Sequence, residues 1–208
     1  MKSEVDLNFY SLTKIHTDFC LSHSHLFKDE HFSTIQYCNT FICENHLDIS
    51  IEIYNNLSSL PRKNTYINFG MGPGFLENLS ELHGKINLES VEWIDQKENF
   101  SRIRMFLDIE NTLTYECNSI YDDDFEIYNC NKKYDYILLI RFYPLNKINS
   151  NLDQVKTILN KLKKYSDKAI IMDSMENNYK EDVLNYFNSI SNKNIICTNG
   201  HDYRVINL

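Results

Sequence analysis

The chain has 208 residues, of which 42% are apolar and 24% charged, as in ordinary folded globular proteins. Its 21 Lys and Arg against 29 Asp and Glu give a net charge of -8. A field of that sign repels phosphate backbones and disfavours nucleic-acid partners. The longest apolar run, Tyr136–Ile140, is far shorter than a membrane span of about 20 residues, and no secretory signal is recognisable. The composition therefore predicts a cytoplasmic protein with no membrane partner.

The cysteine and histidine patterns argue against a disulfide framework and against a metal centre. None of the six cysteines has C-x-x-C spacing, so we expect reduced, buried thiols. Five of the seven histidines precede residue 60, among them His23 and His25. Histidines two apart can share a metal on a strand but point apart on a helix, and no further ligand completes a recognisable set. We therefore expect no metal, and a pocket or surface role for His23 and His25.

The glycines are few and clustered. Only five occur in the chain, and Gly70, Gly72 and Gly74 alternate within one short segment. Thr65–Phe69 before it is rich in β-formers, and a helical apolar pattern follows it at Phe75, Leu76, Leu79 and Leu82. A glycine turn between strand and helix lets a ligand approach the backbone and presents the N–H groups of the helix start. The alternative is a plain β-to-α turn, which needs one glycine rather than three.

An acidic residue follows the next predicted strand. Val91–Ile94 has strand character and ends directly at Asp95, which lies 21 residues after Gly74. In open α/β sheets a carboxylate at this strand end accepts hydrogen bonds from ribose hydroxyls, because the ligand lies across the strand ends. The alternative is that Asp95 is the N-cap of a helix starting near Lys97. The two roles are compatible.

Strands and helices alternate through the remainder of the chain. Further strands are predicted at Thr112–Cys117, Tyr134–Ile140, Lys168–Asp173, Asn194–Thr198 and Tyr203–Leu208. Helices are predicted at Lys97–Leu107, after a capping-box pattern at Ser150–Asp153, and at Lys180–Ile190. This alternation predicts a doubly wound α/β sheet over residues 63–208. Residues 1–62 contain no glycine and carry helical apolar spacing, which predicts an N-terminal helical cap on the acceptor side.

The order of these elements resembles that of class I S-adenosylmethionine-dependent methyltransferases. The resemblance implies a Rossmann-like seven-stranded sheet whose last strand is antiparallel. It also implies that the glycine turn packs against the methionine part of S-adenosyl-L-methionine, that Asp95 meets the ribose, and that Asn118 meets the adenine amino group. The cofactor-binding residues implied in this way are Phe69, Gly70, Met71, Gly72, Gly74, Asp95, Gln96, Asn118, Ser119 and Arg141.

The chain departs from the family where catalysis takes place. The segment after the fourth predicted strand, Arg141–Pro144, has neither the catalytic His of many small-molecule O-methyltransferases nor the Asn/Asp-Pro-Pro-Tyr signature of amino-group methylation. Tyr143 is a candidate for orienting an acceptor or for an aromatic pocket wall, and Arg141 for a carboxylate partner or an ion pair. His23 and His25 are candidate donors or bases from the cap. The implied activity is methyl transfer to a small-molecule acceptor that the sequence does not identify.

A weaker resemblance leads to a second class of activity. Gly70–Pro73 and the closing segment His201–Asn207 are similar to those of nicotianamine synthase-like enzymes, which transfer the aminocarboxypropyl group of the same cofactor. Those enzymes continue the turn with Leu-Pro-Leu-Thr, whereas this chain continues with Gly74–Glu77. A third alternative is a catalytically silent protein that retained the cofactor fold. The sequence leaves the three open, and it leaves the oligomeric state open.

Overall fold

The computed structural model describes residues 46–70, 74–94, 109, 111–146, 150–173, 178–196 and 202–208. These residues belong to two compact units. The described helices of the first unit are α3 (His46–Ser58) and α4 (Phe75–His83); the second unit contains every described strand, with α6 and α8. The predicted helix at Lys97–Leu107 and the turn at Gly200 lie outside the described residues. The predicted boundary between residues 62 and 63 stays a prediction.

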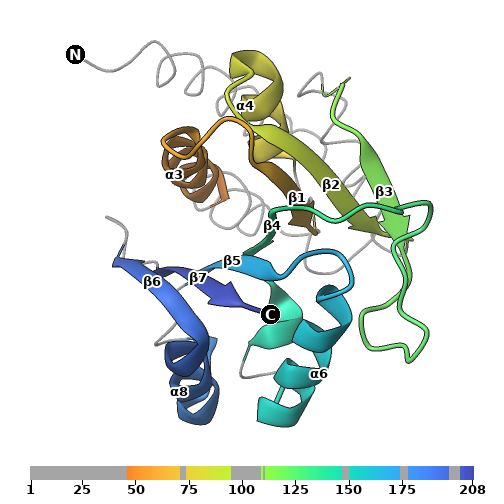
Figure 1. Ribbon diagram of the computed structural model, residues 1–208, viewed down its shortest axis with the longest axis vertical. Coiled ribbons are helices and arrows are strands. Elements are labelled where there is room, and N and C mark those ends of the chain that lie inside the picture. The colour runs from red at the N-terminus through yellow and green to blue at the C-terminus, as the bar shows by residue number, and fades with distance from the viewer. Residues whose placement is uncertain are drawn as a thin grey trace, which may run out of the picture. The chain divides into compact units, whose positions relative to one another are not determined.

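The second unit is built on a seven-stranded sheet with the order β3-β2-β1-β4-β5-β7-β6 (Figure 1). The strands are β1 (Thr65–Phe69), β2 (Asn87–Trp93), β3 (Thr114–Cys117), β4 (Tyr136–Ile140), β5 (Lys168–Asp173), β6 (Ser191–Ile196) and β7 (Asp202–Asn207). Strands β1 to β5 pair in parallel, and β7 pairs antiparallel with both β5 and β6. The predicted doubly wound sheet with an antiparallel last strand is confirmed.

The central strands are buried on both faces, as their unbroken apolar runs predict. In β4, Ile137, Leu138 and Leu139 are all fully buried although successive side chains point to opposite faces. In β1, Ile67 and Phe69 join the apolar core of one face, whereas Asn68 is buried on the other face. Both faces of these two strands are therefore covered.

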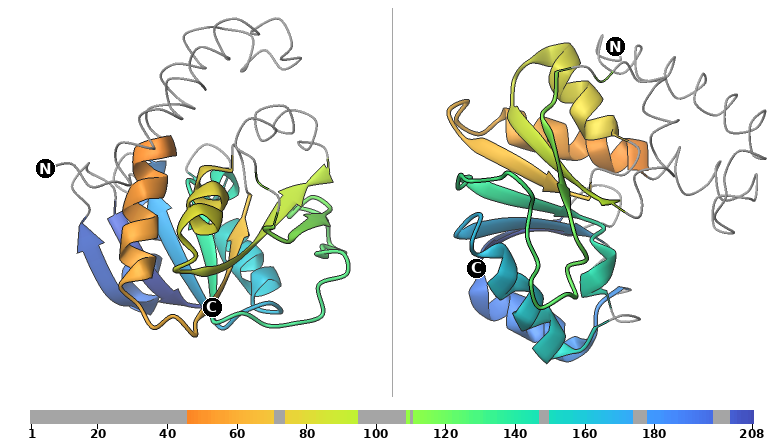
Figure 2. Two further views of the ribbon diagram at one scale, coloured as in Figure 1. Left: turned by 90° about the horizontal axis from the view of Figure 1, so that it is seen from above. Right: turned by 90° about the vertical axis from the view of Figure 1, so that its right-hand side faces the viewer.

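Helices α6 (Leu152–Leu162) and α8 (Glu181–Ile190) lie on the same face of the sheet (Figure 2). Their buried side chains share one core with those of the sheet face, and the helical residues in that core are Val155, Ile158, Leu159, Leu162, Val183 and Phe187. The apolar side of α6 therefore belongs to the core and is not a functional surface.

The capping box of α6 is shifted by one residue from the predicted pattern at Ser150–Asp153. The side chain of Asn151 accepts a hydrogen bond from the Gln154 N–H at 3.0 Å, and the Gln154 side chain accepts one from the Asn151 N–H at 2.9 Å. Ser150 instead donates its hydroxyl to the Leu145 carbonyl at 2.8 Å. Because Ser150 is used to close the preceding turn, the cap passes to the next polar residue.

Two strands begin several residues earlier than predicted. Strand β2 starts at Asn87 rather than Val91, and its register against β1 pairs Thr65 with Asn87. Polar Asn87 and Glu89 hide this beginning in the sequence, since they break the apolar run that marks a buried strand. Strand β6 starts at Ser191 rather than Asn194, because α8 leads into it without a loop.

The first unit shows helical structure within the predicted cap. Helix α3 packs against α4, and the rings of Tyr54 and His83 lie 5.7 Å apart. Helix α4 is buried continuously from Phe75 to Ser80, whereas Leu82 is 55% exposed. The helix predicted from the spacing of Phe75, Leu76, Leu79 and Leu82 is therefore present, and its last apolar residue is exposed because the buried part ends before the last turn.

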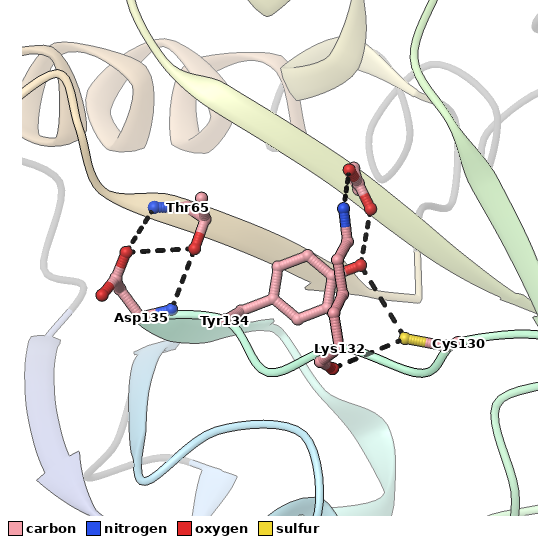
Figure 3. Close-up of polar contacts among 6 residues, drawn as sticks. Thr65, Cys130, Lys132, Tyr134 and Asp135 are labelled. Atoms are coloured by element: carbon pink, nitrogen blue, oxygen red, sulfur yellow. Dashed lines mark hydrogen bonds and ion pairs between the residues drawn. The ribbon is translucent and has the colours of Figure 1, made fainter.

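A polar network ties the connection before β4 to the amino-terminal half of β2 (Figure 3). The Glu89 carboxylate accepts hydrogen bonds from Lys132 and from the hydroxyl of Tyr134, and Tyr134 also lies 3.8 Å from the Cys130 thiol. Burial raises the pKa of Glu89, but hydrogen bonds from Lys132, Tyr134 and Tyr115 outweigh burial and lower the pKa below its usual value. The network therefore favours the ionised carboxylate.

We predict that Glu89→Gln lowers the free energy of unfolding by about 1–2 kcal/mol at pH 7, discounted because Lys132 is half exposed. Since the pKa of Glu89 is lower in the folded than in the unfolded chain, the stabilisation is complete above the unfolded pKa. It is lost as the pH falls through the folded pKa. Chemical denaturation of both proteins between pH 7 and pH 3 measures the difference.

The control is Glu126→Gln, which removes a carboxylate from an exposed pair with Lys164. We expect a free energy of unfolding indistinguishable from that of the wild type, because exposed ion pairs contribute little. A Glu89→Gln deficit that persists unchanged to pH 3 would contradict the charge-based account of the network.

Candidate functional site

The carboxyl ends of the parallel strands lie together at one edge of the sheet, where open α/β folds bind their ligands. The last residues of the five parallel strands are Phe69, Trp93, Cys117, Ile140 and Asp173. The segments that follow them contain most of the sequence-predicted cofactor residues. We call this set of strand ends the carboxyl edge.

Gly70 begins the turn after β1, and two independent constraints require glycine there. Its φ of 83° lies in the left-handed region, where an L side chain is strained. A Cβ added to Gly70 would lie 2.8 Å from Cζ3 of Trp93, closer than real contacts allow. The Gly70 N–H donates to the Val91 carbonyl at 3.0 Å, so the turn is also fixed to β2 through its backbone.

Gly74 is the N-cap of α4 and has φ 83° and ψ 21°. An N-cap residue normally has an extended backbone, so this left-handed cap explains a glycine at the end of the turn as well as at its start. The Gly74 carbonyl accepts the first helical hydrogen bond, from Asn78 at 3.0 Å. The clustering that identified the turn in the sequence therefore has a backbone cause at Gly70 and at Gly74.

An aromatic cluster that sequence reasoning missed lies at the carboxyl edge. The ring of Trp93 stacks on Phe142 with centroids 5.6 Å apart and planes at 19°, and both rings meet Phe69 edge-on at 5.6 and 5.5 Å. Phe69 and Phe142 are buried, and Trp93, the single tryptophan of the chain, is partly buried. Only the uniqueness of Trp93 in the sequence could have drawn attention to it.

The segment after β3 is folded into a tight loop by the side chain of Asn118. Its Oδ1 accepts a hydrogen bond from the Glu126 N–H at 2.8 Å, and its Nδ2 donates to the carbonyl and the Oδ1 of Asp124, each at 3.3 Å. Ser119 accepts through Oγ from the Tyr121 N–H at 3.3 Å. The loop that contains the predicted adenine contacts is thus ordered by the same residues that were assigned to the ligand.

Helix α6 and the turn that follows it hold this loop from outside. The Lys161 ammonium donates to the carbonyls of Ile120 at 3.0 Å and Asp122 at 2.6 Å, and the Tyr165 hydroxyl accepts from the Ile127 N–H at 2.8 Å. The ammonium therefore joins two carbonyls of this loop, one of which, that of Asp122, also accepts a hydrogen bond from the Phe125 N–H at 3.2 Å.

The residue after β4 has an unusual backbone. Arg141 has φ 46°, in the left-handed region that non-glycine residues rarely adopt, and its N–H donates to the Met172 carbonyl at 2.9 Å. Strain of this kind concentrates at functional sites. Tyr143 follows in a short 3₁₀ turn, Tyr143–Leu145.

A buried carboxylate at the end of β5 was also missed by sequence reasoning. Asp173 accepts hydrogen bonds from the Asn178 side chain at 2.7 Å and the Tyr179 hydroxyl at 3.2 Å. Burial and then the neighbouring carboxylate raise the pKa of Tyr179 well above its usual value, so Tyr179 stays a neutral donor. The pair joins the segment before α8 to the carboxyl edge.

Several predicted site residues lie outside the described residues. They are Met71, Gly72, Asp95, Gln96, His23 and His25. Among the residues that the structure does describe, no group of three or more His, Cys, Asp or Glu side chains could hold a metal ion. No helix in that same part of the chain combines the length and hydropathy needed to cross a bilayer.

We predict that Gly70→Ala lowers the free energy of unfolding more than Gly84→Ala does. Gly84 also has a left-handed φ, 58°, but a Cβ there would meet nothing within 4 Å. Gly84→Ala should therefore cost about 1–2 kcal/mol for backbone strain alone. Gly70→Ala should cost about 1–3 kcal/mol more, because its methyl group displaces the Trp93 ring.

Urea denaturation gives both free energies, and the emission of Trp93 in the folded proteins reports on ring displacement. We expect a shifted emission spectrum for Gly70→Ala and an unchanged one for Gly84→Ala. Equal losses of stability for the two variants would mean that the ring contact adds nothing to the requirement for glycine.

The comparisons with known proteins concern the fold. No protein-family model matches the chain, and no curated protein matches it in sequence. Among solved structures, an O-methyltransferase family protein from Burkholderia thailandensis is 8% identical, with a TM-score of 0.55 over 96% of this chain and 70% of that chain. The pyocyanin biosynthetic protein PhzM is 10% identical, with a TM-score of 0.59 over 96% of this chain and 69% of that chain.

A variant of MtNAS, solved in complex with S-adenosylmethionine, is 10% identical and has a TM-score of 0.53. The similarity covers 99% of this chain and 79% of that chain. At these identities the comparisons address architecture, and they agree with the strand order β3-β2-β1-β4-β5-β7-β6. The chain has the fold of class I S-adenosylmethionine-dependent methyltransferases.

Proposed function

We propose that the chain binds S-adenosyl-L-methionine at its carboxyl edge and transfers the methyl group to a small-molecule acceptor. The observation that carries the proposal is the left-handed turn at Gly70, which follows the central strand β1 of this sheet. A strand end without a side chain is where this fold brings a ligand closest to the backbone. Phe69, Met71, Gly72 and Gly74 complete the proposed contact with the methionine part.

The hydrogen-bonding capacity of the next segments fits the remainder of the cofactor. A carbonyl oxygen has two lone pairs, and the Glu126 N–H takes one of those on Asn118 Oδ1. The other suits the adenine amino group, with Ser119 beside it. Asp95 and Gln96, which follow β2, are proposed to accept hydrogen bonds from the ribose hydroxyls.

The proposed reaction is a single displacement at the methyl carbon. A sulfonium supplies an activated methyl group: the nucleophilic atom of the acceptor forms a bond to that carbon, and the carbon–sulfur bond breaks with its electron pair left on sulfur. The products are S-adenosylhomocysteine, the methylated acceptor and a proton. Positioning and exclusion of water provide much of the acceleration when the nucleophile is already reactive.

The residues of this chain that touch the acceptor are proposed to come from two places. Tyr143 follows β4 and would orient the acceptor, and Arg141, a proposed cofactor-binding residue, would pair with a carboxylate of the cofactor or of the acceptor. His23 and His25 belong to the proposed cap over residues 1–62 and would supply a proton acceptor near neutral pH. The sheet domain, residues 63–208, would then bind the cofactor while the cap selects the acceptor.

Two observations support a small acceptor over a nucleic acid. The net charge of -8 opposes binding to a phosphate backbone. Among the structurally similar proteins are an O-methyltransferase family protein and a pyocyanin biosynthetic protein.

A second candidate is aminocarboxypropyl transfer from the same cofactor. It is favoured by the structural similarity to MtNAS, a nicotianamine synthase solved in complex with S-adenosylmethionine. The Gly70–Pro73 sequence of the turn, which resembles that of nicotianamine synthase-like enzymes, also favours it. The nucleophile then attacks the carbon chain instead of the methyl group, and methylthioadenosine leaves. Chromatography of the nucleoside product separates the two activities, since methyl transfer releases S-adenosylhomocysteine. A chain that binds the cofactor and releases neither product would be a silent binding protein.

We predict that the protein binds S-adenosyl-L-methionine in calorimetry and that Asp95→Ala weakens binding by about 30- to 1,000-fold. This range corresponds to about 2–4 kcal/mol for lost charge-assisted hydrogen bonds to two ribose hydroxyls. Asp167→Ala is the control, because Asp167 is exposed and its side chain pairs with Lys133. A lower melting temperature with unchanged affinity would instead identify Asp95 as a helix N-cap.

We predict that His23→Ala and His25→Ala lower turnover while the dissociation constant for the cofactor stays within about threefold. The assay follows S-adenosylhomocysteine release in a screen of amines, phenols and carboxylates. His83→Ala is the control, since His83 contacts Tyr54 in the first unit and has no proposed role in catalysis. Loss of cofactor binding in the first two variants would refute the proposed division between cap and sheet domain.

A further inference from the structure

Trp93 joins three segments of the carboxyl edge that are distant in sequence. It is the last residue of β2, it lies over Gly70 after β1, and it stacks on Phe142 after β4. Because β1 lies between β2 and β4 in the sheet, the indole and the Phe142 ring meet across the end of β1. We propose that Trp93 is a positioning residue that holds the Gly70 turn and the segment after β4 in the geometry that cofactor binding requires.

The first step of the argument is the closeness of the ring to the turn. The Cζ3 and Cη2 atoms of Trp93 would lie 2.8 and 3.1 Å from a Cβ of Gly70, so the six-membered ring of the indole covers the Gly70 backbone. The Gly70 N–H is bonded to the Val91 carbonyl, two residues before Trp93. The turn is thus held to β2 by its backbone and by this side chain.

The second step is that the ring itself has little freedom to move. Trp93 stacks on the buried Phe142 and meets the buried Phe69 edge-on, and Phe69 in turn packs against Phe125 at 5.8 Å. Aromatic pairs in such geometries are favourable beyond their buried area. A displaced indole would therefore move Gly70 and Phe142 together.

The third step is the consequence for ligand binding, and it rests on the proposed function. Gly70 begins the turn proposed for the methionine part. Phe142 lies between Arg141, which is proposed to bind a carboxylate, and Tyr143, which is proposed for the acceptor side. Binding is sensitive to such positions because a contact misplaced by about 1 Å loses much of its hydrogen-bond geometry. The affinity for the cofactor should therefore depend on Trp93 even if the indole does not touch it.

The test uses the full chain with Trp93→Leu, which removes the stack, and Trp93→Phe, which keeps a ring too short to cover Gly70. Leu159→Ala is the matched control, because Leu159 is buried in the same core but belongs to α6. Two quantities are measured for each protein. One is the exchange rate of the Gly70 amide hydrogen in the free protein, compared at equal global stability; the other is the dissociation constant for S-adenosyl-L-methionine.

We expect Gly70 amide exchange to be at least tenfold faster in Trp93→Leu than in Leu159→Ala, with Trp93→Phe between them. The dissociation constant should rise at least tenfold in Trp93→Leu and about threefold in Trp93→Phe, and should stay within twofold in Leu159→Ala. The contrast with Leu159→Ala, which also loses core packing, is a readout that general loss of stability would not reproduce.

Exchange at the control rate in Trp93→Leu would overturn the proposal, and so would wild-type affinity in a variant whose turn exchanges faster. Failure of the proposed function has a different signature. The wild-type protein would then bind no S-adenosyl-L-methionine, while the exchange measurements in the free protein would still decide whether Trp93 positions the turn.

Discussion

The contact between the Trp93 indole and the Gly70 backbone constrains three neighbouring strand ends of the carboxyl edge, those of β2, β1 and β4. No side chain fits at residue 70, since a Cβ would lie 2.8 Å from the ring, and the ring is held by Phe69 and Phe142. The left-handed φ of Gly70 and this close approach are separate requirements that only glycine meets. The end of β1 is thereby fixed relative to β2 and to the segment after β4. The proposed ligand would bind next to this fixed strand end.

The two ends of the sheet are stabilised in different ways. Near the amino ends of the strands, Glu89 accepts hydrogen bonds from Lys132 and Tyr134 (Figure 3). Asp135 accepts hydrogen bonds from the N–H and the hydroxyl of Thr65 at 2.8 and 3.0 Å. At the carboxyl edge, the polar groups of Asn118 and Asp173 order the segments that follow their strands. The first set fixes how the strands start. The second set shapes the loops in which this fold places ligand contacts.

Local signals predicted the sheet and the glycine turn, and long-range contacts determined what the sequence did not predict. The apolar runs of β4 and β5 and the clustered glycines act within a few residues, so the sequence shows them directly. Trp93 and Phe142 are far apart in the chain, and nothing local indicates that their rings stack. Asn118 was assigned to a ligand from its place after β3, yet its amide also closes the loop at Glu126, a role that depends on the fold of that loop. Polar residues at the start of β2 concealed its true length in the sequence. One of them, Glu89, is accommodated in the strand by a hydrogen bond from Tyr134, a residue distant in sequence that lies before β4.

The carboxyl edge cannot by itself decide which group of S-adenosylmethionine the proposed reaction would transfer. Methyl and aminocarboxypropyl transfer both break a carbon–sulfur bond of one sulfonium and leave a neutral thioether, so the turn at Gly70 and the loop at Asn118 would serve both equally. The difference is which carbon lies in line with the nucleophile and sulfur, and that depends on the direction from which the acceptor approaches. Besides the proposed cap over residues 1–62, the segments that follow β4 and β5 are proposed to set this direction. Arg141, with its left-handed backbone, begins the segment after β4. Asp173 ends β5 and leads into the other segment, and it accepts hydrogen bonds from Asn178 and Tyr179. Their geometry is where a choice between the two reactions would be made.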